Sequence, residues 1–242
     1  MRLVQLFEQR IIGRTHGSVA SSIPLKKPSG PQWTESELET KLVEQLDFSA
    51  RVHDIITQPG IRYQEGAKDR LYTPDVFIEL WPDQEGSWSY YLVEVKRSAE
   101  LSAWRRDNKT KIAAAKEWCA HHHAQYRIVT EREIETPHLR NARRLNTKVG
   151  RIPDEEILDA LKSLVRSGPS RAFDLIEALV DEGLNEPDVR DALDAAVANR
   201  HLGCDLSIPY DDNAQIRRAD PLGREYNDRD PIIRLLMHAD SG

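Results

Sequence analysis

The sequence has few cysteines and no long hydrophobic run. Cys119 and Cys204 lie far apart and outside any zinc-ligand spacing, which argues against a disulfide framework or a zinc finger. The longest apolar stretches are a handful of residues, far below the ~20 that a membrane-spanning helix needs. Residues 1–14 lack a continuous apolar segment and a small-residue cleavage site. We therefore predict no signal peptide and a cytoplasmic location.

Charge is spread unevenly along the 242 residues, although the overall composition, 39% hydrophobic and 31% charged, is that of an ordinary globular protein. Residues 1–95 carry 10 Lys and Arg against 14 Asp and Glu, a net charge of −4. Residues 96–151 carry 14 against 6, a net of +8, and residues 152–242 carry 10 against 20, a net of −10. We interpret the middle block as suited to phosphates and the last block as suited to a protein partner. The alternative is that both are solvated helix faces.

The first half of the chain has the pattern of an α/β domain. Residues 1–33 are expected to form an N-terminal arm, because residues 15–33 are rich in Ser, Gly and Pro. Thr34 and Glu37 have capping-box spacing, and leucines at every fourth position predict a helix over residues 35–47. Short strands are expected at 52–56, 62–64, 71–80 and 89–95, then a helix over 98–121, a strand at 126–129 and a helix over 132–144. This order predicts a sheet between helices, in a domain spanning residues 34–150.

The C-terminal third has a different pattern. Apolar residues at helical spacing predict three short helices, over 153–165, after Ser170, and over 186–199. A strand-like segment, HLGCDLSIPY, follows them. We therefore predict a small, mostly helical, winged-helix-like domain over residues 151–212. Residues 213–242 are expected to be a polar tail with one helical anchor at 232–237.

The residues most suited to chemistry lie on two predicted strands. Asp75 in YTPDVFIEL precedes Glu94 in YYLVEVKR by nineteen residues. Residues i and i+2 of a strand point to the same face, so Glu94 and Lys96 are expected side by side. Two carboxylates on neighbouring strands can bind Mg²⁺, and a lysine beside them can stabilise charge on a phosphate. Glu39, on the preceding helix, is the candidate for a third carboxylate.

Other interpretations compete with this one. Glu-Val-Lys is common in strands, so Asp75 and Lys96 alternatively form only a cross-strand ion pair. Other carboxylates of the first helix compete with Glu39, namely Glu35, Glu37 and Glu44. Five basic residues near the site are candidates for contacts with the DNA backbone, or else belong to a solvated helix: Arg97, Arg105, Arg106, Lys109 and Lys111.

The ordered motifs resemble a known family. Pro74-Asp75 followed by Glu94-Val95-Lys96 resembles the PD-(D/E)XK signature of the restriction-endonuclease-like superfamily. Within it the chain is similar to TnsA-type transposon endonucleases, and the similarity extends over residues 33–210. The further motifs that carry it are Ser36-Glu37-Leu38-Glu39, Leu46-Asp47-Phe48, Gln58-Pro59, Tyr72-Thr73-Pro74-Asp75 and HLGCDLSIPY. The resemblance implies Glu39, Asp75 and Glu94 as ligands of Mg²⁺, which Mn²⁺ can replace, and Lys96 as the catalytic lysine.

The resemblance also implies partners. A TnsA-type enzyme is expected to cut one strand of double-stranded DNA at each transposon end, together with a TnsB-like transposase and under a TnsC-like ATPase regulator. Two alternatives remain. One is a stand-alone nuclease of the same fold in repair or defence, and the other is a non-catalytic platform for DNA or protein assembly.

Overall fold

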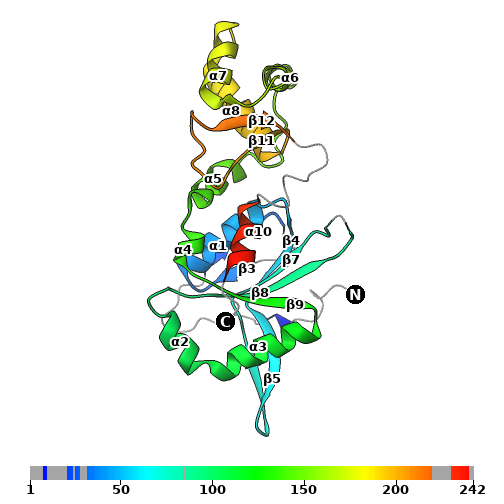
Figure 1. Cartoon of the computed structure of the whole chain (residues 1–242), viewed down its shortest axis with the longest axis vertical. Coiled ribbons are helices and arrows are strands. Elements are labelled where there is room, and N and C mark those ends of the chain that lie inside the picture. The colour runs from blue at the N-terminus through cyan, green and yellow to red at the C-terminus, as the bar shows by residue number, and fades with distance from the viewer. Residues whose placement is uncertain are drawn as a thin grey trace. The chain divides into compact units, whose positions relative to one another are not determined.

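The structure is a computed structural model (Figure 1) and describes residues 8–9, 21–23, 25–27, 32–83, 85–219 and 230–239. The chain divides into two compact units. Unit 1 comprises Met1–Glu135 and Ile232–Gly242, and unit 2 comprises Thr136–Pro231. Most of the predicted N-terminal arm lies outside the described residues. Within them, no helix is long and apolar enough to cross a membrane.

The first helix of unit 1, α1 (Glu37–Phe48), confirms the predicted helix but not its predicted cap. Its N-cap is Ser36, whose side chain accepts a hydrogen bond from the Glu39 amide. Thr34 instead shares a hydrogen bond with the Thr40 hydroxyl. The predicted Thr34–Glu37 capping box was therefore wrong by two residues, because Thr34 is still paired in β3 (Gln32–Thr34) and the helix begins only at Glu37.

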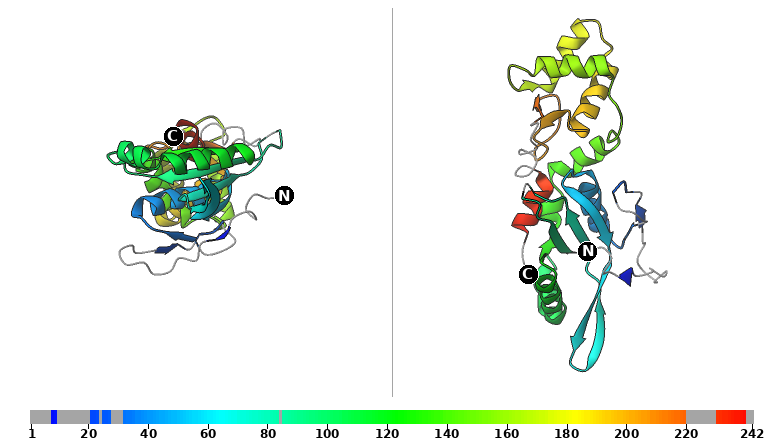
Figure 2. Two further views of the ribbon diagram at one scale, coloured as in Figure 1. Left: turned by 90° about the horizontal axis from the view of Figure 1, so that it is seen from below. Right: turned by 90° about the vertical axis from the view of Figure 1, so that its right-hand side faces the viewer.

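A four-stranded sheet forms the centre of unit 1. Its order is β4 (Val52–Thr57), β7 (Val76–Leu80), β8 (Ser89–Val95) and β9 (Ala124–Val129). The first two pairings are antiparallel and β8–β9 is parallel. A parallel pair requires a crossover. Here α2 (Leu101–Asp107) and α3 (Lys109–His121) supply it, as Figures 1 and 2 show.

Both faces of this sheet are buried. On one face, Val93 and Val95 pack with the leucines of α1. On the other face, Leu92 packs with Ala115 of α3. The predicted α/β fold, a mixed sheet flanked by helices, is thus confirmed.

The predicted strand over 71–80 is two strands. β5 (Pro59–Glu65) and β6 (Lys68–Tyr72) pair as a separate hairpin, on whose edge the short β1 (Glu8–Gln9) lies, and β7 starts only at Val76. The second short N-terminal strand, β2 (Ser21–Ile23), pairs with β3. Pro74 lacks a backbone N–H and cannot continue a hydrogen-bonded strand. The break leaves Asp75 at the start of β7, directly beside the end of β8.

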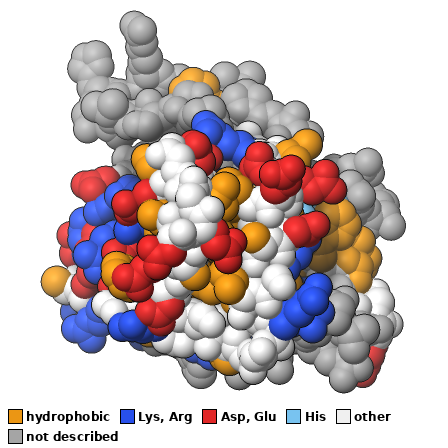
Figure 3. Space-filling view, turned by 90° about the horizontal axis from the view of Figure 1, so that it is seen from above, with side chains coloured by type: hydrophobic (Ala, Val, Ile, Leu, Met, Phe, Trp, Pro, Cys, Tyr) orange, Lys and Arg blue, Asp and Glu red, His pale blue; other side chains and the backbone are white. Residues whose placement is uncertain are grey.

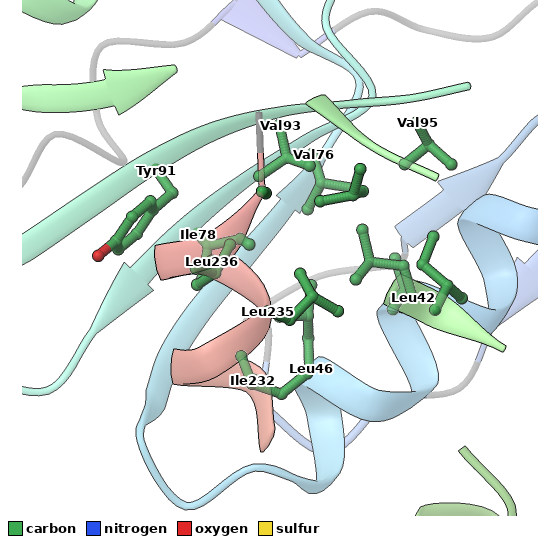
Figure 4. Close-up of a cluster of buried hydrophobic side chains, with 14 of the residues drawn as sticks. Leu42, Leu46, Val76, Ile78, Tyr91, Val93, Val95, Ile232, Leu235 and Leu236 are labelled. Atoms are coloured by element: carbon green, nitrogen blue, oxygen red, sulfur yellow. The ribbon is translucent and has the colours of Figure 1, made fainter. Parts of the chain in front are cut away.

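The C-terminal helix α10 (Pro231–His238) completes the core of unit 1 (Figure 4). Ile232, Leu235 and Leu236 are buried in the same cluster as Ile78 and Val93. The Arg127 guanidinium donates a hydrogen bond of 2.7 Å to the Leu236 carbonyl. The expected helical anchor is therefore present, while residues 220–229 lie outside the described residues.

Unit 2 has a winged-helix-like order of elements. α6 (Glu155–Leu164), β10 (Ser170–Arg171), α7 (Ala172–Asp181) and α8 (Glu186–Ala198) are followed by β11 (Leu202–Cys204) and β12 (Gln215–Arg218). The strands form an antiparallel sheet in the order β10-β12-β11. This agrees with the predicted, mostly helical C-terminal region with a small sheet.

Unit 2 starts earlier than the predicted boundary at residue 151. The helix expected over 132–144 is split into α4 (Glu131–Ile134) and α5 (Pro137–Asn146), because Thr136 is extended before Pro137. The Asn141 side chain of α5 then donates hydrogen bonds to the carbonyls of Leu206 and Ile208. These bonds attach α5 to the unit that follows it in sequence.

Candidate functional site

Asp75, Glu94 and Lys96 meet at the junction of β7 and β8. The Lys96 Nζ lies 2.6 Å from Glu94 Oε1 and 3.3 Å from Asp75 Oδ2. The prediction that Glu94 and Lys96 project side by side is confirmed. Asp75 and Glu94 are buried, with exposed fractions of 9% and 4%. The three groups form a compact charged cluster that is mostly removed from solvent.

Backbone hydrogen bonds hold Asp75 in this position. Its amide donates to the Val93 carbonyl, and its Oδ2 accepts from the Val95 amide at 2.7 Å. The Val76–Val93 register of the two strands places Asp75 opposite Glu94. The sheet itself therefore determines the spacing between these two carboxylates.

Glu39 joins the cluster through electrostatics. It is buried in the first turn of α1, and its carboxylate accepts hydrogen bonds from the Glu35 amide and the Ser36 hydroxyl, at 2.9 and 2.7 Å. Its pKa is raised to about 7, because burial and repulsion from Asp75 outweigh the Glu35 and Ser36 hydrogen bonds and the attraction to Lys96. Among the competing carboxylates, Glu37 is exposed and pairs with Lys41. Glu39 is thus the buried acid that acts electrostatically on the cluster.

Glu94 has a second partner, Tyr72, to which the sequence-based predictions assign no role. The Tyr72 hydroxyl donates a hydrogen bond to Glu94 Oε2. The pKa of Glu94 is raised to about 7, because burial and repulsion from Asp75 outweigh the lowering effects of Lys96 and Tyr72. Burial lowers the pKa of Lys96, but attraction to Asp75 and Glu94 outweighs burial and the pKa is raised. Tyr72 stands in the quoted motif three residues before Asp75, which was the only sign of its position.

The donor set suits a divalent cation. Three buried carboxylates and one ammonium leave a net charge of −2 when all are ionised, and the raised pKa values of Glu39 and Glu94 show that the cluster favours added positive charge. Carboxylate oxygens are the ligands that Mg²⁺ prefers. In the described part of the chain, no three Asp, Glu, His or Cys side chains are already arranged around one metal position. The three carboxylates are thus suitable ligands for a cation, and in this structure the Lys96 ammonium contacts both Asp75 and Glu94.

Basic residues of α2 and α3 lie near this cluster. Lys96 Nζ is 5.2 Å from the centre of the Trp104 ring, and Lys111 Nζ is 6.0 Å from the centre of the Tyr72 ring. Two of the predicted DNA contacts, Arg105 and Lys109, line a groove of about 310 Å³ together with Ile112, Ala113 and Lys116. Besides Lys111, two predicted DNA contacts remain, Arg97 just before α2 and Arg106 on α2. The Arg97 side chain is 48% exposed and forms a 4.0 Å ion pair with Glu135, and the Arg106 side chain is 68% exposed and pairs with Asp107.

Unit 2 presents the opposite charge. Exposed acidic residues lie on α6 and α7, among them Glu155, Asp159 and Glu177. Figure 3 shows acidic, basic and hydrophobic side chains mixed on the face of the molecule seen from above. The exposed carboxylates of α6 and α7 would repel a nucleic-acid backbone.

Comparison with known proteins identifies the domain that holds the cluster. Residues 49–131 match the family described as TnsA-like endonuclease N terminal. The match contains β4 to β9 and with them Asp75, Glu94 and Lys96, whereas Glu39 precedes it. A search of curated proteins found no match. Residues 49–131 are therefore a TnsA-like endonuclease domain, which implies a nuclease that acts on DNA.

Proposed function

We propose, from the TnsA-like endonuclease domain over residues 49–131, that this chain is the Mg²⁺-dependent endonuclease subunit of a heteromeric transposase. It cuts one strand at each transposon end, together with a TnsB-like transposase and under the control of a TnsC-like ATPase. The observation that carries the proposal is the contact of Lys96 with both Asp75 and Glu94 inside the matched domain.

Each residue of the cluster has a role in this proposal. Glu39, Asp75 and Glu94 would hold Mg²⁺, which Mn²⁺ can replace. When bound, the cation supplies Lewis-acid polarisation of the phosphate and a more acidic water. The Lys96 ammonium stabilises the negative charge that develops on the scissile phosphate. Lys96 is poised for this, because its Nζ is already held at the carboxylates.

The basic residues of α2 and α3 would bind the DNA backbone. Arg105 and Arg106 on α2 and Lys109 and Lys111 on α3 supply cations on these helices, and Arg97 supplies another just before α2. Phosphate contacts of this kind orient a duplex without reading its sequence. Acidic unit 2 is left for protein partners, in agreement with its surface charge.

Reconstituted cleavage tests the proposal. Purified chain, the TnsB-like transposase and transposon-end DNA are combined with Mg²⁺, and nicking is measured for the wild type, Glu94→Ala and Lys96→Ala. We expect both variants to lose at least about 100-fold in rate, the loss typical of removing a group that stabilises transition-state charge. Glu85→Ala, at an exposed position, and Lys162→Ala, at a half-exposed position on α6, are the matched controls outside the cluster and should cut normally.

Three outcomes would redirect the proposal. Intact end cleavage by Glu94→Ala and Lys96→Ala would contradict it. Strong Mg²⁺-dependent cleavage of generic DNA by the chain alone would favour the stand-alone nuclease. Failure of both Mg²⁺ and Mn²⁺ to raise the melting temperature would favour the non-catalytic platform, because a ligand that binds the native state must stabilise it.

A further inference from the structure

Gln58 has an unusual backbone beside the candidate site. It lies between β4 and β5 with a φ of 54°, in the left-handed region that residues other than glycine rarely adopt. Pro59 follows it and further restricts its backbone. Its exposed fraction is 4%, so no solvent-facing turn explains the conformation. Strained residues of this kind persist where the surrounding structure requires them, often at functional sites.

Gln58 makes hydrogen bonds to two residues of the candidate site. Its backbone amide donates to the Asp75 carbonyl at 2.9 Å. Its side-chain amide donates to Glu39 Oε2 at 3.4 Å. Gln58 thereby connects the Glu39 carboxylate on α1 with the backbone of Asp75, just before β7. The backbone bond continues the β4–β7 pairing one residue beyond Thr57–Val76, so the side-chain amide is the part of Gln58 that adds a contact to the site.

The chemistry of the contact suits a site for a cation. A carboxamide donor favours the ionised form of Glu39 without adding positive charge. An ammonium or guanidinium at the same place would compete with a divalent cation, as Lys96 already does for Asp75 and Glu94. Groups that orient metal ligands in this way typically contribute about 10- to 100-fold to metal affinity.

We infer that Gln58 is a positioning residue that sets the Glu39 carboxylate relative to Asp75 for cation binding. The inference rests on the proposed function and adds a residue to it. The left-handed backbone lies where the chain passes from β4 into β5, and the side-chain amide bonds to Glu39 from that position. The side-chain amide, and not the turn alone, is the functional part.

Two variants test the side chain separately from the strain. Gln58→Gly removes the amide and relaxes the backbone, because glycine adopts positive φ freely. Gln58→Met removes the amide but keeps the length of the side chain and the strain. His123→Gly is the matched control, since His123 also has positive φ, 53°, in unit 1 but lies in the turn between α3 and β9.

The readouts are melting temperature against Mg²⁺ or Mn²⁺ concentration, and the Mg²⁺ dependence of transposon-end cleavage. For both Gln58 variants we expect the half-saturating metal concentration to rise about 10-fold or more, with most of the maximal rate recovered at saturating Mg²⁺. His123→Gly should keep the wild-type metal dependence. A purely structural role would instead lower the metal-free melting temperature and leave half-saturation unchanged.

The outcomes separate this inference from the proposed function. If the wild-type protein cleaves and is stabilised by metal, but both Gln58 variants keep its half-saturating metal concentration, this inference is overturned and the proposed function is not. A change in Gln58→Met but not in Gln58→Gly would overturn it as well, since the amide is missing from both. Absence of metal stabilisation and of cleavage in the wild type would overturn the proposed function, and this inference with it.

Discussion

The two units differ in how their buried and half-buried charges are balanced. In unit 2, Arg144 makes two hydrogen bonds to Asp194, at 2.9 and 3.0 Å, and Lys148 pairs with Asp191. In unit 1, Lys96 is shared between two buried carboxylates, and Glu39 adds a third. A paired charge is already compensated by its partner, whereas an excess of buried charge of one sign destabilises the protein unless a ligand compensates it. Unit 1 is therefore the unit in which the proposed cation would offset an excess of buried negative charge.

The comparison also changes how the charge pattern of the sequence is understood. Of the 14 Lys and Arg residues in the basic block 96–151, five lie in residues 136–151 and so belong to unit 2. Arg144 and Lys148 are among them and pair with acidic residues of α8. The phosphate-binding interpretation thus applies to α2 and α3. It does not extend to all of the basic block.

The largest effect that would sharpen this comparison is expected for Lys96→Met. Cleavage should fall by about 10²- to 10³-fold, because the ammonium that stabilises transition-state charge is gone. Binding of Mg²⁺ should persist or tighten, since no ammonium competes for Asp75 and Glu94. Cleavage assays and melting temperature in a Mg²⁺ titration measure the two effects. Loss of Mg²⁺ stabilisation in this variant would contradict the proposed division of roles.

A second prediction concerns which unit α10 stabilises. Leu236→Ala removes a fully buried side chain from the core of unit 1 and should destabilise that unit by ~2–5 kcal/mol. Leu161→Ala, fully buried in α6, is the matched variant for unit 2. Hydrogen exchange resolved by segment measures both. If Leu236→Ala weakened protection in unit 2 and spared β7 and β8, the assignment of α10 to unit 1 would be wrong.

A third prediction is that the units respond to acid in opposite directions without metal. Glu39 and Glu94 have pKa values near 7, above the ordinary 4.5, so folded unit 1 binds more protons than its unfolded chain between these values. Their contribution to the stability of unit 1 therefore rises as pH falls from 7 to 5. Burial lowers the pKa of His138 in unit 2 to about 4 from 6.5, although Asp230 opposes the shift. The contribution of His138 to the stability of unit 2 therefore falls as pH falls from 7 to 5, because the unfolded chain then binds more protons than the folded unit.

Hydrogen exchange at pH 7 and pH 5, corrected for intrinsic exchange rates, measures this difference. Glu94→Gln should weaken the response of unit 1, and His138→Gln should weaken that of unit 2. Saturating Mg²⁺ should suppress the response of unit 1, since a bound cation keeps the carboxylates ionised. Equal responses of both units in every variant would contradict the comparison.

The smallest expected effect concerns DNA binding. Lys111→Ala should lower the slope of log affinity against log salt by about 0.9, the value for one phosphate contact on duplex DNA. Lys162→Ala on α6 should leave the slope unchanged, because unit 2 is acidic. Fluorescence anisotropy with duplex DNA over a salt series is the measurement. An equal change in both variants would show that the cations of unit 1 have no special part in binding.

Local sequence patterns were sufficient for several parts of the structure. Leucine spacing predicted α1, and the two-residue period of strands placed Glu94 beside Lys96, because both periods are properties of one element alone. The three helices of unit 2 followed from the same kind of evidence. The resemblance of the Pro74-Asp75 and Glu94-Val95-Lys96 motifs pointed to the endonuclease domain that the family match later identified.

Contacts between distant segments were decided only by the tertiary structure. The Tyr72–Glu94 and Gln58–Glu39 hydrogen bonds join residues 22 and 19 positions apart, and no periodicity encodes such pairs. The return of α10 to the core of unit 1 likewise depends on apolar surface that the sheet leaves for it. Local patterns in the sequence thus predicted most of the elements, though not the breaks at Pro74 and Pro137, and named the candidate acids. Packing decided which of those acids are buried together, since burial and repulsion exist only once the chain has folded.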